Sequence, residues 1–257
     1  MAFYHFLVLG EEKRQYYLAQ MLKKEGHEVM EAMSYQPGYH DAILLPVPQT
    51  AMFFEENKEK FQKGQVVYGC KFSETAIDYA KERGIRIVDY YKEDGVAERN
   101  ALATAEGAVS EALIHGCVSI QGSECLVTGY GTCGAALAAK LSQWRASVTI
   151  MERKEKKRER AKSYGYQACS FDAPKDTMSK YDFIFNTVPA PVLTKERLQG
   201  VKPEVCIIAS RPGGTDFSYC QESSIFAKLC LGLPGIYAPK SSAGILMEVI
   251  KKTILGD

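Results

Sequence analysis

The chain has 257 residues, enough for two domains of ordinary size or for one large domain. With 46% hydrophobic and 25% charged residues, its composition is that of a globular protein and excludes a disordered or collagen-like chain. The 32 Lys and Arg residues nearly balance the 31 Asp and Glu residues, leaving a net charge of +1. We therefore expect no global attraction to nucleic acid or to a membrane surface, and any anion site must be local.

The cysteines and the N-terminal residues bear on the cellular compartment. The eight cysteines contain no CxxC pair and no following HxxxH, so we expect no metal site. Several lie in apolar runs, where a thiol behaves as a small hydrophobe, which favours a reduced state. Residues 1–10 lack a basic leader and a long apolar core, and no apolar run reaches the roughly 20 residues that span a bilayer. These observations predict a cytoplasmic protein.

Short β-rich runs alternate with helical stretches along the chain, the pattern of a parallel sheet with helices on both faces. An Ala-rich helix over 96–115 separates two such series. In the first series, the predicted strands are 6–9, 29–33, 42–45, 66–68 and 85–88, and the predicted helices are 11–25, 52–62 and 73–83. In the second series, the predicted strands are 125–128, 148–151, a short one near 168, 183–185, 205–208 and 227–230.

The two series predict an α/β fold with two doubly wound parallel-sheet domains. We place a flavodoxin-like first domain at 1–98 and a Rossmann dinucleotide-binding domain at 99–240. A last helix, predicted at about 241–255, follows the Pro234-Gly235 turn. We expect this C-terminal segment, 241–257, to return and pack on the first domain.

The segment Gly129-Tyr130-Gly131-Thr132-Cys133-Gly134 is a GxGxxG motif between a strand and a helix. Gly129 permits the tight turn, Gly131 lets the backbone approach a pyrophosphate, and Gly134 lets the helix pack against its strand. The helix N-terminus adds N–H donors for phosphates. The motif therefore predicts a nicotinamide dinucleotide site that includes Thr132 and Cys133. A glycine-rich turn without a ligand is the alternative interpretation.

The residues after the next strand bear on the choice between NAD and NADP. Glu152 occupies the position where an acidic side chain binds the ribose hydroxyls of NAD. The run Arg153-Lys154-Glu155-Lys156-Lys157-Arg158 follows it, and its cations crowd the first turn of the presumed helix, where the helix dipole disfavours them. That placement favours a ribose 2'-phosphate and hence NADP, with NAD still possible. A solvated charged face is the alternative.

Two further loops follow strands of the second series, and ligands bind beyond the carboxyl ends of parallel strands. Asn186 and Thr187 are candidates to hydrogen-bond the cofactor, and Val188 and Pro189 follow them in the same predicted segment. The alternative is that Asn186 and Thr187 only cap a turn before Pro189. Arg211 lies in a Gly-rich loop, and its planar guanidinium can bind a carboxylate through two hydrogen bonds. The alternative is an exposed arginine without a ligand.

Polar residues near the expected domain boundary are further candidates for a cleft between the domains. Asn100, Thr104 and Glu106 lie where the interdomain helix begins, although Thr104 and Glu106 also suit helix capping. Lys240 precedes the last helix and is a candidate general acid/base or carboxylate anchor, with a surface lysine as the alternative. None of the four histidines follows a strand of the second series, which disfavours a histidine-based hydride transfer.

Several blocks together resemble one family, the A subunit of dipicolinate synthase from spore-forming bacteria. The Pro-Gly-Gly-Thr-Asp-Phe run at 212–217 and the Leu-Pro-Gly run at 233–235 are the most specific. Two departures fall at cofactor positions: Thr132 stands where the family usually has Arg, and Glu152 stands where a small residue is common. The remaining similar blocks are 41–48, 100–107, 185–189 and 238–240.

The resemblance implies an NADP-linked enzyme of sporulation that oxidises a dihydrodipicolinate-type cyclic diacid to pyridine-2,6-dicarboxylate. It also implies a partner, the flavodoxin-like B subunit, and we expect a homo-oligomer. Such a diacid needs cations at both ends of its ring, for which Arg211, Lys240 and Arg14 are our candidates. Asn100, Thr104 and Glu106 would line the opposite wall. Alternatives are a 2-hydroxyacid-dehydrogenase-like enzyme and a catalytically idle, dinucleotide-binding regulatory subunit.

Overall fold

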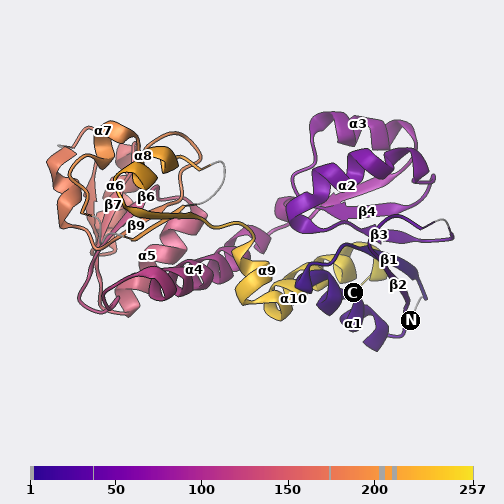
Figure 1. Ribbon diagram of the computed structural model, residues 1–257. Helices are drawn as coiled ribbons and strands as arrows, with labels where there is room; N and C mark the ends of the chain where they lie inside the picture. Colours follow the sequence, from indigo (N-terminus) through magenta and orange to yellow (C-terminus); the bar gives the residue numbers. More distant parts are fainter. Residues whose placement is uncertain (1–2, 37, 174, 203–205, 210–212, 257) are drawn as a thin grey trace. The chain divides into compact units, whose positions relative to one another are not determined.

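A computed structural model describes residues 3–36, 38–173, 175–202, 206–209 and 213–256. The chain forms two compact units, one of residues 1–100 with 234–257 and one of residues 101–233. Each unit is built on its own parallel sheet (Figure 1). The α/β fold class with two such sheets is therefore confirmed.

The first unit holds a five-stranded sheet in the order β2-β1-β3-β4-β5. Its described strand pairs are all parallel, so a helix or loop returns the chain between strands. The strands are β1 (His5–Leu9), β2 (Glu28–Ala32), β3 (Ala42–Leu44), β4 (Val66–Gly69) and β5 (Arg86–Asp89). The helices are α1 (Lys13–Lys24), α2 (Thr50–Asn57), α3 (Glu74–Glu82), α9 (Leu233–Tyr237) and α10 (Pro239–Ile250), with short helical turns η1 (Val47–Gln49), η2 (Lys58–Lys60) and η3 (Tyr90–Lys92).

Alternate residues of the strands enter two separate cores, one on each face of this sheet. On β1, Phe6 and Val8 pack into one core, while Leu7 and Leu9 pack into the other. This alternation follows from the two-residue period of a strand, and both sets are apolar because helices cover both faces. The second core is rich in aromatic rings, among them Phe54 of α2.

The C-terminal helix returns to the first sheet, as predicted. α10 lies beside α1, and the two share one core, to which Leu18 and Leu22 of α1 and Leu246 and Ile250 of α10 contribute (Figure 1). A π-helical turn, η5 (Lys251–Leu255), extends α10. One boundary differs from our prediction, because α10 begins at Pro239, whose fixed φ suits the first helical position. Lys240 is therefore exposed within the first turn rather than in a loop before the helix.

The second unit holds a six-stranded parallel sheet in the order β11-β10-β9-β6-β7-β8. The helix α4 (Val96–His115) enters it from the first unit, and the predicted short strand near residue 168 is present. The strands are β6 (Glu124–Thr128), β7 (Ser147–Met151), β8 (Gln167–Cys169), β9 (Phe183–Asn186), β10 (Cys206–Ala209) and β11 (Phe226–Leu229). The helices are α5 (Thr132–Gln143), α6 (Glu155–Ser163), α7 (Lys195–Leu198) and α8 (Phe217–Glu222), with a helical turn η4 (Lys175–Lys180).

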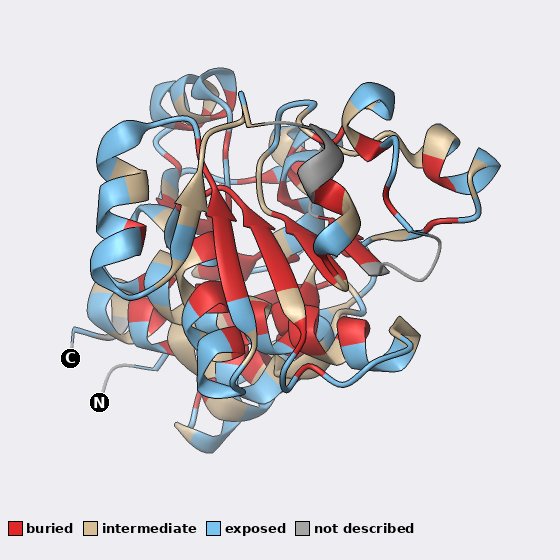
Figure 2. Cartoon of the chain, turned by 90° about the vertical axis from the view of Figure 1, so that its left-hand side faces the viewer, coloured by how far each residue is buried: buried red, intermediate tan, exposed pale blue. Residues whose placement is uncertain are grey.

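The central strands of the second sheet are buried over most of their length. In Figure 2 these strands are red, while the outer faces of the flanking helices are exposed. Leu126 of β6, Ile184 of β9 and Ile207 of β10 meet in one core with side chains of α7 and α8. Within the described residues, no helix is long and apolar enough to cross a membrane.

Candidate dinucleotide-binding site

The order of the second sheet reverses between β6 and β9, which are hydrogen-bonded neighbours although β7 and β8 lie between them in sequence. In open parallel sheets, a ligand binds beyond the carboxyl ends of the strands at such a reversal. The glycine motif follows β6, and the Asn186-Thr187-Val188-Pro189 segment begins at the end of β9. The fold thus brings these two predicted segments to the same edge of one sheet.

The three motif glycines have different surroundings. Gly129 has a φ of +84°, and a Cβ there would lie 2.8 Å from Val188 and 2.9 Å from the Thr187 hydroxyl. A Cβ on Gly134 would lie 2.2 Å from the Gly129 carbonyl oxygen, so only glycine lets α5 start this close to the turn. A Cβ on Gly131 would meet no atom within 4 Å. The first and third glycines serve the fold of the turn, whereas Gly131 keeps open the space that a pyrophosphate needs.

The space beside Gly131 is lined by exposed backbone at the start of α5. Thr132 and Cys133 are both exposed there, and Gly131 precedes the first helical residue without a side-chain cap. The first N–H groups of a helix have no partner within the helix and point toward an anion. The turn therefore fits the diphosphate of a dinucleotide.

Glu152 holds two backbone segments together beside this turn. One carboxylate oxygen accepts the Tyr130 N–H at 3.0 Å, and the other accepts the Lys154 N–H at 3.0 Å. Burial alone would raise the pKa of Glu152, but these two hydrogen bonds and the charge of Lys157, 3.7 Å away, outweigh it, so the pKa is lowered. The side chain is ionised at neutral pH and fixes the glycine turn against the end of β7.

The basic segment after β7 is exposed at the same edge. Arg153 and Lys154 are exposed, and neither makes an ion pair within the described part of the chain. Arg158 folds back instead, donating to the backbone carbonyls of Glu152 at 2.9 Å and of Arg153 at 2.7 Å. The backbone that carries the two exposed cations is thereby held in place.

Asn186 and Thr187 direct their polar groups to the protein itself. The side-chain oxygen Oδ1 of Asn186 accepts hydrogen bonds from the Thr128 hydroxyl at 2.7 Å and from the Val188 N–H at 3.0 Å. Its amide nitrogen donates to the Thr215 hydroxyl at 3.1 Å. The Thr187 hydroxyl and N–H both donate to the Thr128 carbonyl, at 2.8 and 3.2 Å. Val188 is half-buried and Pro189 exposed beside them.

In the first unit, the structure brings Arg14 and Asn100 to one buried hydroxyl. Arg14 is 2% exposed, forms an ion pair with Glu12 through Nε and Nη2, and donates from Nη1 to Ser242 at 3.4 Å. The Ser242 hydroxyl donates to Asn100 at 3.3 Å. A Cβ on Gly235 would lie 2.1 Å from the Glu12 carboxylate, so α9 packs directly on this ion pair.

The remaining predicted residues lie apart from these groups or outside the described residues. Glu106 is exposed and pairs with Lys140 at 3.0 Å, in the last turn of α5 and about 12 Å along that helix from the glycine turn. Thr104 is half-buried on α4. Arg211 lies outside the described residues.

Comparison with known proteins identifies the family of this chain. The family "D-isomer specific 2-hydroxyacid dehydrogenase, NAD binding domain" matches residues 97–214. The A subunit of dipicolinate synthase from Bacillus subtilis (strain 168) is 33% identical over 230 residues, covering 83% of this chain and 77% of the relative. The chain belongs to the dipicolinate synthase A-subunit family.

Solved structures agree with this membership of the dipicolinate synthase A-subunit family. The crystal structure of the dipicolinate synthase A subunit from Bacillus halodurans has a TM-score of 0.83 and 28% identity, with 97% of each chain covered. A transhydrogenase from Sinorhizobium meliloti has a TM-score of 0.68, 16% identity and coverage of 97% and 94%, a likeness of fold alone. The matched NAD-binding domain includes the glycine turn, Glu152 and Asn186.

Sequence reasoning on this family member missed the residues that support the site. Thr128, Tyr130 and Thr215 hold the site through hydrogen bonds, and Arg158 braces the segment after β7. Thr215 had a sequence signal, since it lies in a specific Gly-Gly-Thr-Asp run after a strand. Tyr130 lies inside the glycine motif and contributes its backbone N–H. Thr128 and Arg158 carry no local pattern that separates them from ordinary strand and helix residues.

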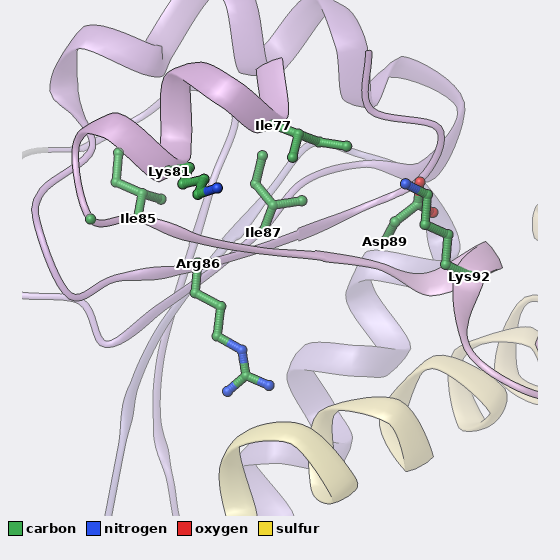
Figure 3. A pocket seen from close by; sticks show the side chains of 8 residues that line it. Ile77, Lys81, Ile85, Arg86, Ile87, Asp89 and Lys92 are labelled. Atoms are coloured by element: carbon green, nitrogen blue, oxygen red, sulfur yellow. The ribbon is translucent and has the colours of Figure 1, made fainter. Parts of the chain in front are cut away.

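A pocket of about 470 Å³ lies elsewhere, along the edge strand β5 and helix α3 of the first unit (Figure 3). Ile77, Ile85 and Ile87 give it an apolar lining, and the Arg86 side chain turns away to the Thr253 carbonyl, 3.1 Å away. None of the predicted site residues lines it. No group of three His, Cys, Asp or Glu residues in the described chain is placed to hold a metal.

Proposed function

We propose that this chain is the NADP-linked oxidoreductase subunit of a dipicolinate synthase. Its reaction is the oxidation of a dihydrodipicolinate-like cyclic diacid to pyridine-2,6-dicarboxylate. The observation that carries the proposal is the glycine turn with open space at Gly131, in a member of the dipicolinate synthase A-subunit family. A nicotinamide dinucleotide bound there supplies a two-electron hydride acceptor.

The reaction requires three groups from the protein, which are one base and a cation for each of the two carboxylates. The ring loses a hydride and one proton, so a base must accept the proton while cations hold the two carboxylates. Arg211 is our candidate for a bidentate carboxylate clamp, because a planar guanidinium fixes the orientation of a carboxylate. Lys240 is our candidate for a second anchor or the proton acceptor. Arg14 stays a candidate anchor, with Asn100, Thr104 and Glu106 as substrate-binding candidates.

The preference for NADP is supported by the two exposed cations beside Glu152. The Glu152 carboxylate already accepts backbone N–H groups with both oxygens, and it lies 8% exposed. Arg153 and Lys154 are exposed and without ion pairs in the described chain, which suits a 2'-phosphate. A charge-assisted hydrogen bond contributes roughly 1.5 to 3 kcal/mol, about one to two decades in affinity.

The proposed assembly includes a second protein chain. The relative's name, the A subunit of dipicolinate synthase, implies that the synthase also has a B subunit. We propose that this partner is flavodoxin-like, that the chain also forms a homo-oligomer, and that both act in the cytoplasm during sporulation.

The test follows NADPH formation from freshly generated dihydrodipicolinate, with and without the flavodoxin-like partner. We expect Arg211→Ala to lower kcat/KM by about ten to a few hundred fold, and Arg211→Lys to recover only part of that loss. The surface variant Arg83→Ala should match the wild type, because the ion pair of Arg83 is with exposed Glu59. Arg153→Ala should weaken NADP binding and spare NAD.

Three outcomes would count against the proposal. If Arg211→Ala and Lys240→Ala both turn over like the wild type, the substrate site is misplaced. If the wild type binds NADP but shows no turnover with or without the partner, the chain is a regulatory dinucleotide-binding protein instead. If it binds NAD more tightly than NADP, Glu152 governs the choice of cofactor.

A further inference from the structure

We propose that Asn186 is a positioning residue for the nicotinamide end of the cofactor, acting by holding residues 187–193 after β9 and residues 213–216 after β10 in one arrangement. The inference rests on the proposed function, since it requires a dinucleotide at the glycine turn. It differs from a direct contact of Asn186 with the cofactor, which is one of the two interpretations that the sequence alone leaves open.

The polar groups of Asn186 reach three separate segments. Its side-chain oxygen Oδ1 accepts a hydrogen bond from the Thr128 hydroxyl at the end of β6 and another from the N–H of Val188 in the loop after β9. Its side-chain nitrogen Nδ2 donates a hydrogen bond to the hydroxyl of Thr215, which follows β10 in sequence. The residue is 2% exposed, so these bonds are shielded from water and their loss leaves buried groups unsatisfied. The side chain of Asn186 is thus committed to protein partners.

The two loops are also packed directly on each other beside Asn186. A Cβ on Gly214 would lie 2.4 Å from the Ala190 carbonyl oxygen and 2.8 Å from the Asn186 amide nitrogen. The Gly214 carbonyl accepts the N–H groups of Val192 and Leu193 at 3.0 and 2.9 Å. Backbone hydrogen bonds thus join residues 190–193 to residues 214–216, and Asn186 adds a buried side-chain bond to Thr215 and ties the joined segments to Thr128 at the end of β6.

The geometry of the sheet assigns these joined segments to the nicotinamide end. Glu152 and the two exposed cations mark the adenosine side, because they follow β7 on one side of β6. A dinucleotide whose diphosphate lies at the glycine turn must send its other nucleoside toward the opposite side, over β9 and β10. The loops tied by Asn186 follow β9 and β10. Loosening them should disturb the nicotinamide and leave the adenosine half bound.

The experiment compares two probes on one set of variants. NADPH binding is measured by the fluorescence of its reduced nicotinamide, and 2',5'-ADP, which carries only the adenosine half, by calorimetry. In Asn186→Ala we expect NADPH to bind about tenfold more weakly, with 2',5'-ADP within about twofold of the wild type. NADH and 5'-AMP are the corresponding probes if the wild type favours NAD.

Two variants of Thr215 provide a matched pair that removes or keeps one hydroxyl. Thr215→Val deletes the acceptor of the Asn186 amide at nearly constant volume, and we expect it to reproduce most of the NADPH loss. Thr215→Ser keeps the hydroxyl and should bind both probes like the wild type. This pair decides the question if Asn186→Ala fails to fold, because Thr215 is only half-buried.

Equal weakening of NADPH and 2',5'-ADP would overturn the proposal, because Asn186 would then support the whole domain and not one end of the site. Unchanged NADPH binding in Asn186→Ala or in Thr215→Val would overturn it as well. The proposed function fails separately, when the wild type binds NADPH but does not oxidise dihydrodipicolinate. A wild type that binds neither probe would overturn both.

Discussion

The first turn of each sheet leads from a central strand into a helix, yet the two turns are filled differently. Gly10 after β1 and Gly129 after β6 both have positive φ, at +95° and +84°. In the second turn, glycines follow at 131 and 134, and the space over the helix N-terminus is open. In the first turn, Glu12 stands at the N-cap of α1 and pairs with the buried Arg14.

The difference shows that the topology offers a ligand position and that side chains decide whether it is open. Both turns lie at the carboxyl edge of a parallel sheet next to the reversal of strand order. The first is occupied by the protein's own carboxylate and guanidinium, whereas the second is cleared by glycine. Four experiments can break or sharpen this contrast, and the one with the largest expected effect comes first.

The largest effect is expected from opening the ion pair of the first turn. Glu12→Ala leaves the charge of Arg14, whose side chain is 3% exposed, without its carboxylate. We expect the free energy of unfolding to fall by on the order of 3 kcal/mol. Urea unfolding measures it, and Glu31→Ala is the matched control, because its pair with Lys23 is largely exposed and should change stability by less than about 1 kcal/mol. Equal stability of Glu12→Ala and the wild type would show that Arg14 finds another partner.

The next effect is expected from closing the open turn. Gly131→Val should weaken NADPH binding by about 100-fold, roughly 2.7 kcal/mol, because the new side chain fills the diphosphate space. The melting temperature should hold, since a Cβ at Gly131 meets no atom within 4 Å. Glu11→Val places the same side chain at an exposed position of the first turn and should leave NADPH binding unchanged. Equal affinity in Gly131→Val would remove the dinucleotide from this turn.

A third prediction uses the exposed thiols as reporters. Cys133 lies exposed in the glycine turn, and Cys117 is exposed after α4. With NADPH at about ten times its dissociation constant, alkylation of Cys133 by iodoacetamide should slow about tenfold. Alkylation of Cys117 should keep its rate. Peptide mass spectrometry separates the two sites, and equal protection of both thiols would indicate a global change and not occupancy of the turn.

The smallest effect is expected on the pH dependence of stability, at the turn where α1 leads into β2. The corresponding turn of the second unit leads from α5 into β7. The N–H of His27 donates to Leu22 and that of Ala146 donates to Leu141, so the two turns share one hydrogen bond pattern. His27 is buried, neither ring nitrogen has a hydrogen-bond partner among the described residues, and burial lowers its pKa below the ordinary value of 6.5.

Because the unfolded chain binds a proton at His27 more readily than the folded chain, the free energy of unfolding should fall as the pH drops below about 6.5. His27→Phe should flatten this dependence, as measured by urea midpoints between about pH 7.5 and 5.5. An unchanged slope in the variant would assign the acid sensitivity to other groups.

Much of the fold could be read from local pattern. The strand at 6–9 and the helix after it follow from apolar runs and a helical period ending at Gly26, and both are present within a few residues. The helix predicted at 52–62 spans Thr50–Asn57 instead, followed by the short turn η2. Phe61 then adopts an extended conformation and packs with Phe54 in one core. The glycine motif was visible because the positive φ of Gly129 and the close approach of Gly134 to the turn restrict those two positions to glycine.

The sequence by itself determined the two parallel sheets, the place of the glycine turn and the family, because these rest on periodicity, glycine spacing and contiguous motifs. Only the tertiary structure decided what the polar side chains do. Glu152 binds two backbone N–H groups, Asn186 ties two loops, and Arg14 pairs with Glu12 beneath α9. Two of the partners of Asn186, Thr128 and Thr215, lie 58 and 29 residues away in sequence. Contacts at that separation exist only after the sheet has formed, and no local pattern encodes which of several polar groups will meet.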